Sequence, residues 1–165
     1  MITRNIAGQP MDNYSLRRRV WRYGPLVLWM IFISFASTGE FSAVNTSKII
    51  RPLLLWLFPN LSEGRLALIH LFVRKAAHFT EYAVLGVLAH RAFFASSHVF
   101  LRRFWFWVGI LLIMIYALLD EFHQSFVASR TASIYDSLID VVGGLTALVI
   151  FAIWSDRRRQ KKART

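Results

Sequence analysis

Four apolar runs dominate the chain, and short polar segments separate them. The runs cover residues 23–37, 76–94, 104–119 and 136–154. Each approaches or reaches the roughly 20 apolar residues that carry a helix across a bilayer. The pattern therefore predicts an all-α fold, an integral membrane four-helix bundle.

A fifth apolar stretch, from Ile49 to Phe58, is shorter and is interrupted by Arg51 and Pro52. About ten residues cannot cross a hydrocarbon core roughly 30 Å thick. We interpret this stretch as a short interfacial or re-entrant segment between the first and second spans.

Local signals predict where several helices begin and end. Ser62 is a candidate N-cap for a helix that begins at Glu63 and runs without a break to Phe94. Pro25 falls in the first turn of the first span, where its missing N–H costs nothing. Residues 95–103 are predicted to form a short basic loop and residues 120–135 a polar connection. The polar tail from residue 156 onward is predicted to be disordered.

Composition and charge agree with a membrane protein. The chain has 165 residues, 56% of them hydrophobic, and a net charge of +11. The positive charges flank the apolar runs, which is typical of topology signals and of contact with anionic lipid headgroups. We therefore expect membrane lipids, and no nucleic acid, as partners.

The absence of cysteine excludes disulfides, thiolate metal ligands and a cysteine nucleophile. The first apolar run has no small-residue cleavage site and is expected to remain as an anchor.

The distribution of positive charge predicts the orientation. Fourteen of the 20 Lys and Arg residues lie before the first span, around the 95–103 loop and in the tail, and six lie on the other side. The positive-inside rule then places both termini in the cytoplasm of a multi-pass protein. The expected organisation is a basic cytoplasmic N-terminus over 1–22, a membrane domain over 23–154 and a basic cytoplasmic tail over 155–165.

With this topology, ionisable residues gather at the outer ends of the second, third and fourth spans. Five of the nine acidic residues belong to this group. Charged side chains inside membranes normally face the bundle interior or a wet cavity, pair with one another and serve a function. We therefore predict a shared polar site. Its candidate catalytic residues are His78, Glu81, Asp120, Glu121, His123 and Asp140, and its candidate substrate-binding residues include Lys75, Gln124, Arg130 and Asp136.

Each group also has a structural interpretation. Asp136 suits a helix N-terminus, and His78 with Glu81 could form an interhelical hydrogen-bond pair. Asp120 and Glu121 could mark the point where a span meets water. Each of these interpretations explains one group of residues, but none explains why all the groups lie at the same depth in the membrane. The remaining residues of note lie outside the site: His70, His90 and His98 are interpreted as interfacial or surface residues, and the small residues Gly143, Gly144 and Ala147 should let a neighbouring helix come close.

Three ordered strings resemble the motifs of the VanZ-like family. They are KAAHFTEY over residues 75–82 followed by Leu85 and Gly86, YALLDEFHQSF over 116–126 followed by Arg130, and Asp136 with Asp140 followed by Gly143 and Gly144. The resemblance covers about residues 24–152. It implies a small bacterial inner-membrane protein related to proteins linked to resistance to the glycopeptide teicoplanin. It adds Tyr82 to the candidate substrate-binding residues, and it supports the motif residues as functional without naming a reaction.

The first functional hypothesis is a membrane enzyme with an outward-facing site. Neighbouring histidines and carboxylates can divide acid and base roles, with His78 or His123 as the base and Glu81 or Asp120 orienting it. Lys75 and Arg130 could hold a phosphate or carboxylate. The substrate would be a lipid or a lipid-linked cell-envelope precursor, and the enzyme a hydrolase or transferase acting on a lipid-linked phosphate.

Two other hypotheses remain open. The same cluster could bind a lipid headgroup or an antibiotic, or relay protons in transport, for which four spans would need a homo-oligomer. It could also be an ion-paired latch that only holds the bundle together. We favour the enzyme-like or ligand-binding interpretation over the latch. A divalent metal held by Asp, Glu and His side chains would also fit the enzyme, but HExxH and similar signatures are absent. No metal ligands are therefore assigned, and the cofactor stays unknown.

Overall fold

The computed structural model describes residues 13–38, 43–127 and 134–163, and the elements within these ranges are all helices. The predicted all-α class is therefore confirmed for this part of the chain. The helices are α1 (Asn13–Ala36), α2 (Ala43–Leu57), α3 (Glu63–Phe94), α4 (Val99–Arg103), α5 (Trp105–Gln124) and α6 (Ile134–Ala163).

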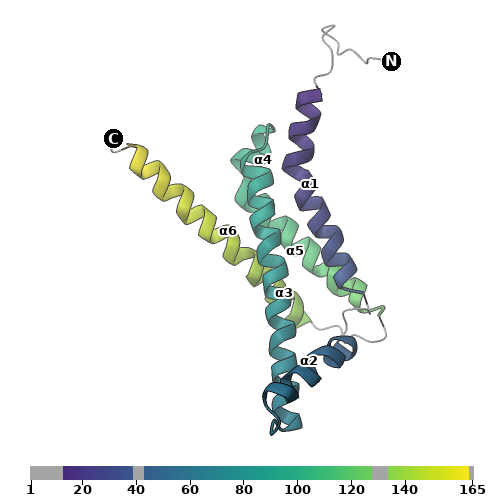
Figure 1. The fold of residues 1–165 in the computed structure, drawn as a ribbon. Coiled ribbons are helices and arrows are strands. Elements are labelled where there is room, and N and C mark those ends of the chain that lie inside the picture. Colours follow the sequence, from purple (N-terminus) through teal and green to yellow (C-terminus); the bar gives the residue numbers. More distant parts are fainter. Residues whose placement is uncertain (1–12, 39–42, 128–133, 164–165) are drawn as a thin grey trace.

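The longest helix, α3, is the one around which the others are arranged (Figure 1). Its most extensive contact is with α6, followed by α5 and α1, while α2 packs against its first turns. The start of α1 and the end of α6 point toward the same end of the molecule (Figure 1). The contacts of α3 with α1, α5 and α6 bring the candidate site residues of separate segments close together.

Small residues allow α3 and α6 to approach closely. A Cβ atom at Gly86 would lie 2.5 Å from the carbonyl oxygen of Gly144 and 3.0 Å from the Cβ of Ala147. A Cβ at Gly143 would collide with the carbonyl oxygen of Phe79. The predicted close approach of a neighbouring helix at the small residues of α6 is therefore confirmed.

The core lies where α1, α3, α5 and α6 meet. It combines large aliphatic side chains with alanines, one tyrosine and one phenylalanine. Its buried residues are Leu26, Ile33, Tyr82, Leu85, Ala89, Ala92, Phe93, Ile113, Ala117 and Leu148. The alanines keep the helices near one another, as the glycines do on α6.

Within the described ranges, two helical segments are long and apolar enough to cross a membrane, Trp105–Gln124 and Tyr135–Arg157. Only 22% and 33% of their most apolar windows are buried inside the protein. Large apolar side chains such as Leu111, Leu118 and Ile150 are exposed on their outer faces. An apolar exterior of this kind suits a lipid environment, whereas the core helix of a soluble protein would be mostly covered.

The predicted start and end of α3 are confirmed, and the ends of other helices differ from the prediction. Helix α3 begins at Glu63 after Ser62, whose backbone is extended, and runs unbroken to Phe94. The loop over 95–103 contains the short helix α4, and α5 continues through Gln124 into the predicted polar connection. The predicted tail disorder is wrong as far as residue 163, because α6 continues to Ala163. The tail is rich in Arg, Lys, Gln and Ala, which are good helix formers.

The prediction that Pro25 lies in a first turn is also wrong, because α1 begins at Asn13 and Pro25 is in its interior. An interior proline cannot donate to the carbonyl four residues earlier. That carbonyl belongs to Trp21, and Nη2 of Arg91 donates to it at 3.2 Å. A side chain of α3 thus provides the hydrogen bond that the proline removes from α1.

The Ile49–Phe58 stretch falls largely in helix α2, and Pro52 lies inside that helix. One face of α2 carries exposed Ile49, Leu53 and Trp56. Arg51 on α2 forms a salt bridge with Glu63 at the start of α3, with 2.5 Å between Nη2 and Oε1. The helix therefore has the amphipathic character expected of an interfacial segment.

Candidate functional site

Three helices bring three buried ionisable side chains to one point. His78 comes from α3, Asp120 from the last turns of α5 and Asp140 from the second turn of α6. These residues are 6%, 6% and 1% exposed, respectively. One ligand atom from each residue lies within 4.8 Å of those of the other two. We call these residues the buried triad.

His78 and Asp140 form the first hydrogen-bonded pair of the triad. Nδ1 of His78 lies 3.1 Å from Oδ1 of Asp140. The pair joins α3 to α6 beside the close contact of Phe79 with Gly143. A buried carboxylate at one ring nitrogen fixes the orientation of the imidazole and stabilises its protonated form, which suits a proton acceptor.

Asp120 lies in a second network that joins α5 to α1. The hydroxyl of Ser37 donates to Oδ1 of Asp120, and Nε2 of Gln124 donates to Oδ2 at 2.9 Å. Gln124 also lies 3.4 Å from the Ser37 hydroxyl. Both oxygens of the Asp120 carboxylate therefore have donors, and its position is fixed from two helices.

Two oxygen atoms beside the triad have no hydrogen-bond partner among the described residues. They are Oη of Tyr82 and Oε1 of Gln124, on side chains that are 0% and 1% exposed. Tyr82 lies one helical turn after His78 on α3, and Gln124 is held against Asp120 by its amide nitrogen. Buried polar atoms normally have partners, so these two point to a ligand or solvent at the site.

A cationic pair lies about one helical turn away from the triad along α3 and α6. Nζ of Lys75 lies 2.9 Å from Oδ1 of Asp136, and Nη2 of Arg74 lies 3.2 Å from Oδ2. Both cations are partly exposed, with side chains 36% and 26% accessible. Two positive charges share one carboxylate, so this edge keeps a net positive charge that suits an anionic group.

The VanZ/LLP1 family model matches residues 20–155 of the chain. The protein belongs to the VanZ/LLP1 family. No curated protein and no solved structure matches the chain. The match covers α3, α5 and most of α1 and α6, so the whole triad lies within the VanZ/LLP1 region, as the resemblance of the motifs predicted.

The predicted site residues of this VanZ/LLP1 protein divide into two groups. The triad, Tyr82 and Gln124 lie together, and Lys75 lies beside them with Asp136. Glu81 and Glu121 are half-buried and His123 is exposed, so these three are outside the triad. Arg130 lies outside the described residues. The functional roles assigned to all of these residues remain predictions.

Sequence reasoning missed the polar contacts made by α1. Ser37 donates to Asp120. The indole N–H of Trp29 donates to the backbone carbonyl of Glu81 at 2.9 Å. The hydroxyls of Ser34 and Tyr116 lie 2.7 Å apart. Ser37 is the last residue of the first predicted span and lies at the same depth as the other polar residues. This position in the sequence could have indicated that Ser37 contacts the site.

His90 was predicted at an interface or surface, and this prediction is wrong. The ring of His90 stacks on Phe151 with 4.4 Å between centroids and meets Trp105 edge-on at 4.6 Å. It lies 12 residues beyond His78, about 18 Å farther along α3. His90 is therefore an aromatic core residue outside the site.

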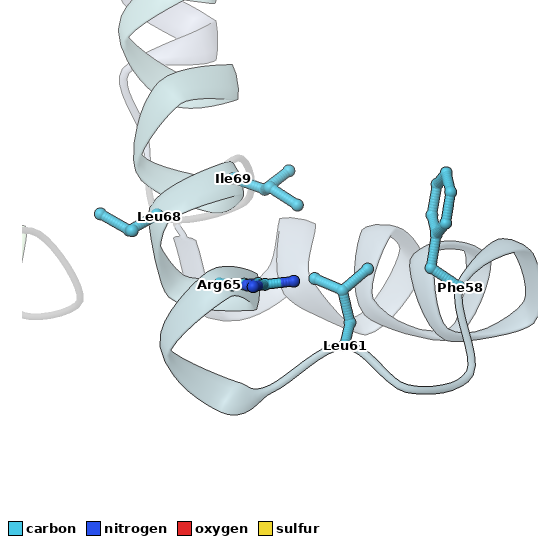
Figure 2. A pocket seen from close by; sticks show the side chains of 5 residues that line it. All are labelled: Phe58, Leu61, Arg65, Leu68 and Ile69. Atoms are coloured by element: carbon cyan, nitrogen blue, oxygen red, sulfur yellow. The ribbon is translucent and has the colours of Figure 1, made fainter.

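An open groove of about 420 Å³ lies at the corner between α2 and α3. Figure 2 shows Arg65 among apolar side chains there, and the lining residues are Phe58, Leu61, Arg65, Leu68 and Ile69. Arg65 lies about 20 Å from His78 along the helix. The groove is therefore separate from the triad. Its lining is mostly apolar, whereas the triad consists of ionisable side chains.

Proposed function

We propose that this protein is a multi-pass inner-membrane protein that binds, and acts on, the phosphate of a lipid or lipid-linked envelope molecule. In this proposal α1, α3, α5 and α6 span the bilayer, and both termini lie in the cytoplasm. The triad then faces the extracytoplasmic side, where envelope precursors lie. The observation that carries the proposal is the buried triad next to a cationic edge that is partly exposed.

The cationic edge supports the choice of an anionic substrate. Among the described residues, Lys75 and Arg74 share one ion-pair partner, the Asp136 carboxylate, so a phosphate can add favourable contacts without removing that partner from either cation. Arginine and lysine donors hold phosphate oxygens through charge-assisted hydrogen bonds. The edge lies about one helical turn from His78, within reach of a headgroup bound at the membrane face.

The His78–Asp140 pair supports hydrolysis or group transfer at that phosphate. In hydrolysis the water oxygen bonds to phosphorus, the bond from phosphorus to the leaving oxygen breaks, and His78 takes the proton of the water and returns it to the leaving oxygen. Asp140 orients the imidazole and stabilises its charge. General base catalysis of this kind contributes about 10²–10⁴-fold to a rate.

A comparison of lipids from cells with and without the protein tests this function. We expect a phosphate-bearing lipid or lipid-linked precursor to change in amount when the protein is absent. His78→Gln should reproduce the loss at normal membrane abundance, whereas His123→Gln, at an exposed histidine, should behave like the wild type. An unchanged lipid profile would contradict the proposal.

The same variants separate the alternatives. A structural latch predicts that the phenotype of His78→Gln follows its membrane abundance. Transport predicts activity that requires an ion gradient, whereas an enzyme turns over in detergent. A role in teicoplanin resistance, which the family resemblance implies, predicts lower tolerance in cells that carry His78→Gln.

Binding to the cationic edge can be measured directly. The purified protein should bind vesicles that contain phosphatidic acid more tightly than neutral vesicles. Lys75→Met should weaken this preference, and Lys48→Met, which removes the same charge from α2, should not. Equal effects of the two substitutions would indicate general attraction by positive charge in place of a phosphate site.

A further inference from the structure

We propose that His78, Asp120 and Asp140 bind a divalent transition-metal ion, which goes beyond the proposed lipid function. The geometry of the triad is the first argument. Metal bonds of about 2.0–2.2 Å keep any two ligand atoms within roughly 4.4 Å of each other. The three ligand atoms already lie within 4.8 Å of one another. A tetrahedral ion holds its ligand atoms about 3.3–3.6 Å apart, so side-chain adjustments of up to about 1 Å would complete the coordination.

The charge balance of the triad is the second argument. Asp120 and Asp140 are both buried, and among the described residues no lysine or arginine pairs with either. Lys75 and Arg74, about one helical turn away along α3, are paired with Asp136. Buried carboxylates close together need a compensating positive charge, and His78 supplies at most one. A divalent ion would neutralise both carboxylates while His78 stays neutral and binds it through nitrogen. With the ion bound, His78 would hold the metal and would not be the base of the proposed hydrolysis.

The unpartnered oxygens are the third and independent argument. Oη of Tyr82 and Oε1 of Gln124 lack partners, although both side chains are fully buried. His78 is hydrogen-bonded to Asp140, and Asp120 accepts a hydrogen bond from Ser37, but these bonds leave the two oxygens unsatisfied. A metal ion with its bound water provides both missing partners, since Gln124 Oε1 accepts from such a water and Tyr82 Oη can donate or accept.

The ligand types indicate the class of ion. One imidazole nitrogen and two carboxylate oxygens suit zinc, manganese or iron, and the chain has no cysteine to favour a softer ion. The ligands come from three helices separated by at least 20 residues. A local metal-binding motif in the sequence is therefore not expected even though the site is compact.

Metal titration of the full-length protein in detergent tests the proposal. After treatment with a chelator, Zn²⁺ and, separately, Mn²⁺ are added without lipid, and bound metal is measured by mass spectrometry and calorimetry. We expect one ion per chain. His78→Gln, Asp120→Asn and Asp140→Asn should each weaken binding by at least about tenfold. The matched controls His98→Gln and Asp156→Asn, at exposed positions of the same residue types, should bind like the wild type.

Three results would overturn the proposal. They are no stoichiometric binding by the wild type, equal losses in triad and control variants, and binding that disappears with Arg130→Gln but persists in the triad variants. If the triad variants fail to fold, X-ray absorption of the zinc-loaded wild type decides. One imidazole and several oxygen ligands support the site, and any other set contradicts it. Because no lipid is present, this test can fail while the lipid function stands, and the reverse is equally true.

Discussion

Replacing Gly86 with alanine perturbs the closest contact between α3 and α6. The new Cβ would lie 2.5 Å from the carbonyl oxygen of Gly144, where ordinary contacts begin at 3.4 Å. It would also lie 3.0 Å from the Cβ of Ala147. Backbone atoms cannot rotate away as a flexible side chain can, so the two helices must separate by several tenths of an ångström. Overpacking of this kind costs about 1–3 kcal/mol.

Gly64→Ala is the matched control on the same helix. A Cβ at Gly64 meets nothing within 4 Å. Alanine is favoured over glycine by about 0.8–1.0 kcal/mol in a helix interior, and Gly64, the second residue of α3, gains at most that amount. The comparison therefore offsets part of the intrinsic gain at Gly86. Gly86→Ala should therefore be less stable than Gly64→Ala by about 1–3 kcal/mol.

Unfolding in mixed micelles of increasing sodium dodecyl sulfate content, followed by circular dichroism, measures this difference. The separation of α3 from α6 should also lengthen the hydrogen bond between His78 and Asp140. A loss of function in Gly86→Ala without loss of abundance would then reflect displacement of the site. Equal free energies of unfolding for the two variants would refute the close packing of α3 on α6.

The remaining predictions concern α1. Ser37→Ala should lower the free energy of unfolding by about 1–3 kcal/mol, because it removes a donor from the buried carboxylate of Asp120. Ser155→Ala should change it little, because among the described residues the Ser155 hydroxyl donates to Ala152 within α6. A larger loss in Ser155→Ala than in Ser37→Ala would contradict the Ser37 contact. Trp29→Phe should cost about 1 kcal/mol through the lost hydrogen bond to Glu81 in the same unfolding assay, and an unchanged stability would exclude that bond.

The depth of the polar residues could be predicted from the sequence, but their rotation about each helix axis could not. Apolar runs fix where a span begins and ends, and this is how His78, Asp120 and Asp140 were expected at one end of the bundle. Helix α5 is apolar around most of its circumference. Its sequence therefore does not indicate that Asp120 is buried while His123 is exposed, because packing against α1, α3 and α6 decides this.

The ends of helices that extend into polar sequence also could not be predicted from the apolar pattern. The first span was predicted from its apolar residues alone, which placed Pro25 in a first turn, but the helix begins 12 residues earlier at Asn13. Helix α6 likewise continues past the apolar run into the basic tail. Hydropathy marks the apolar portion of a helix, while backbone propensity and tertiary contacts such as that of Arg91 with Trp21 extend it.

Cross-linking between engineered cysteines tests most directly whether the triad forms. The chain has no native cysteine, so each engineered pair reacts without background. Two pairs, His78→Cys with Asp120→Cys and His78→Cys with Asp140→Cys, should cross-link within one chain on treatment with a short thiol reagent. The pair His78→Cys with Asp156→Cys, on the same helices as the second pair, should not. Efficient cross-linking of the control, or of neither triad pair, would contradict the convergence of α3, α5 and α6 at one site.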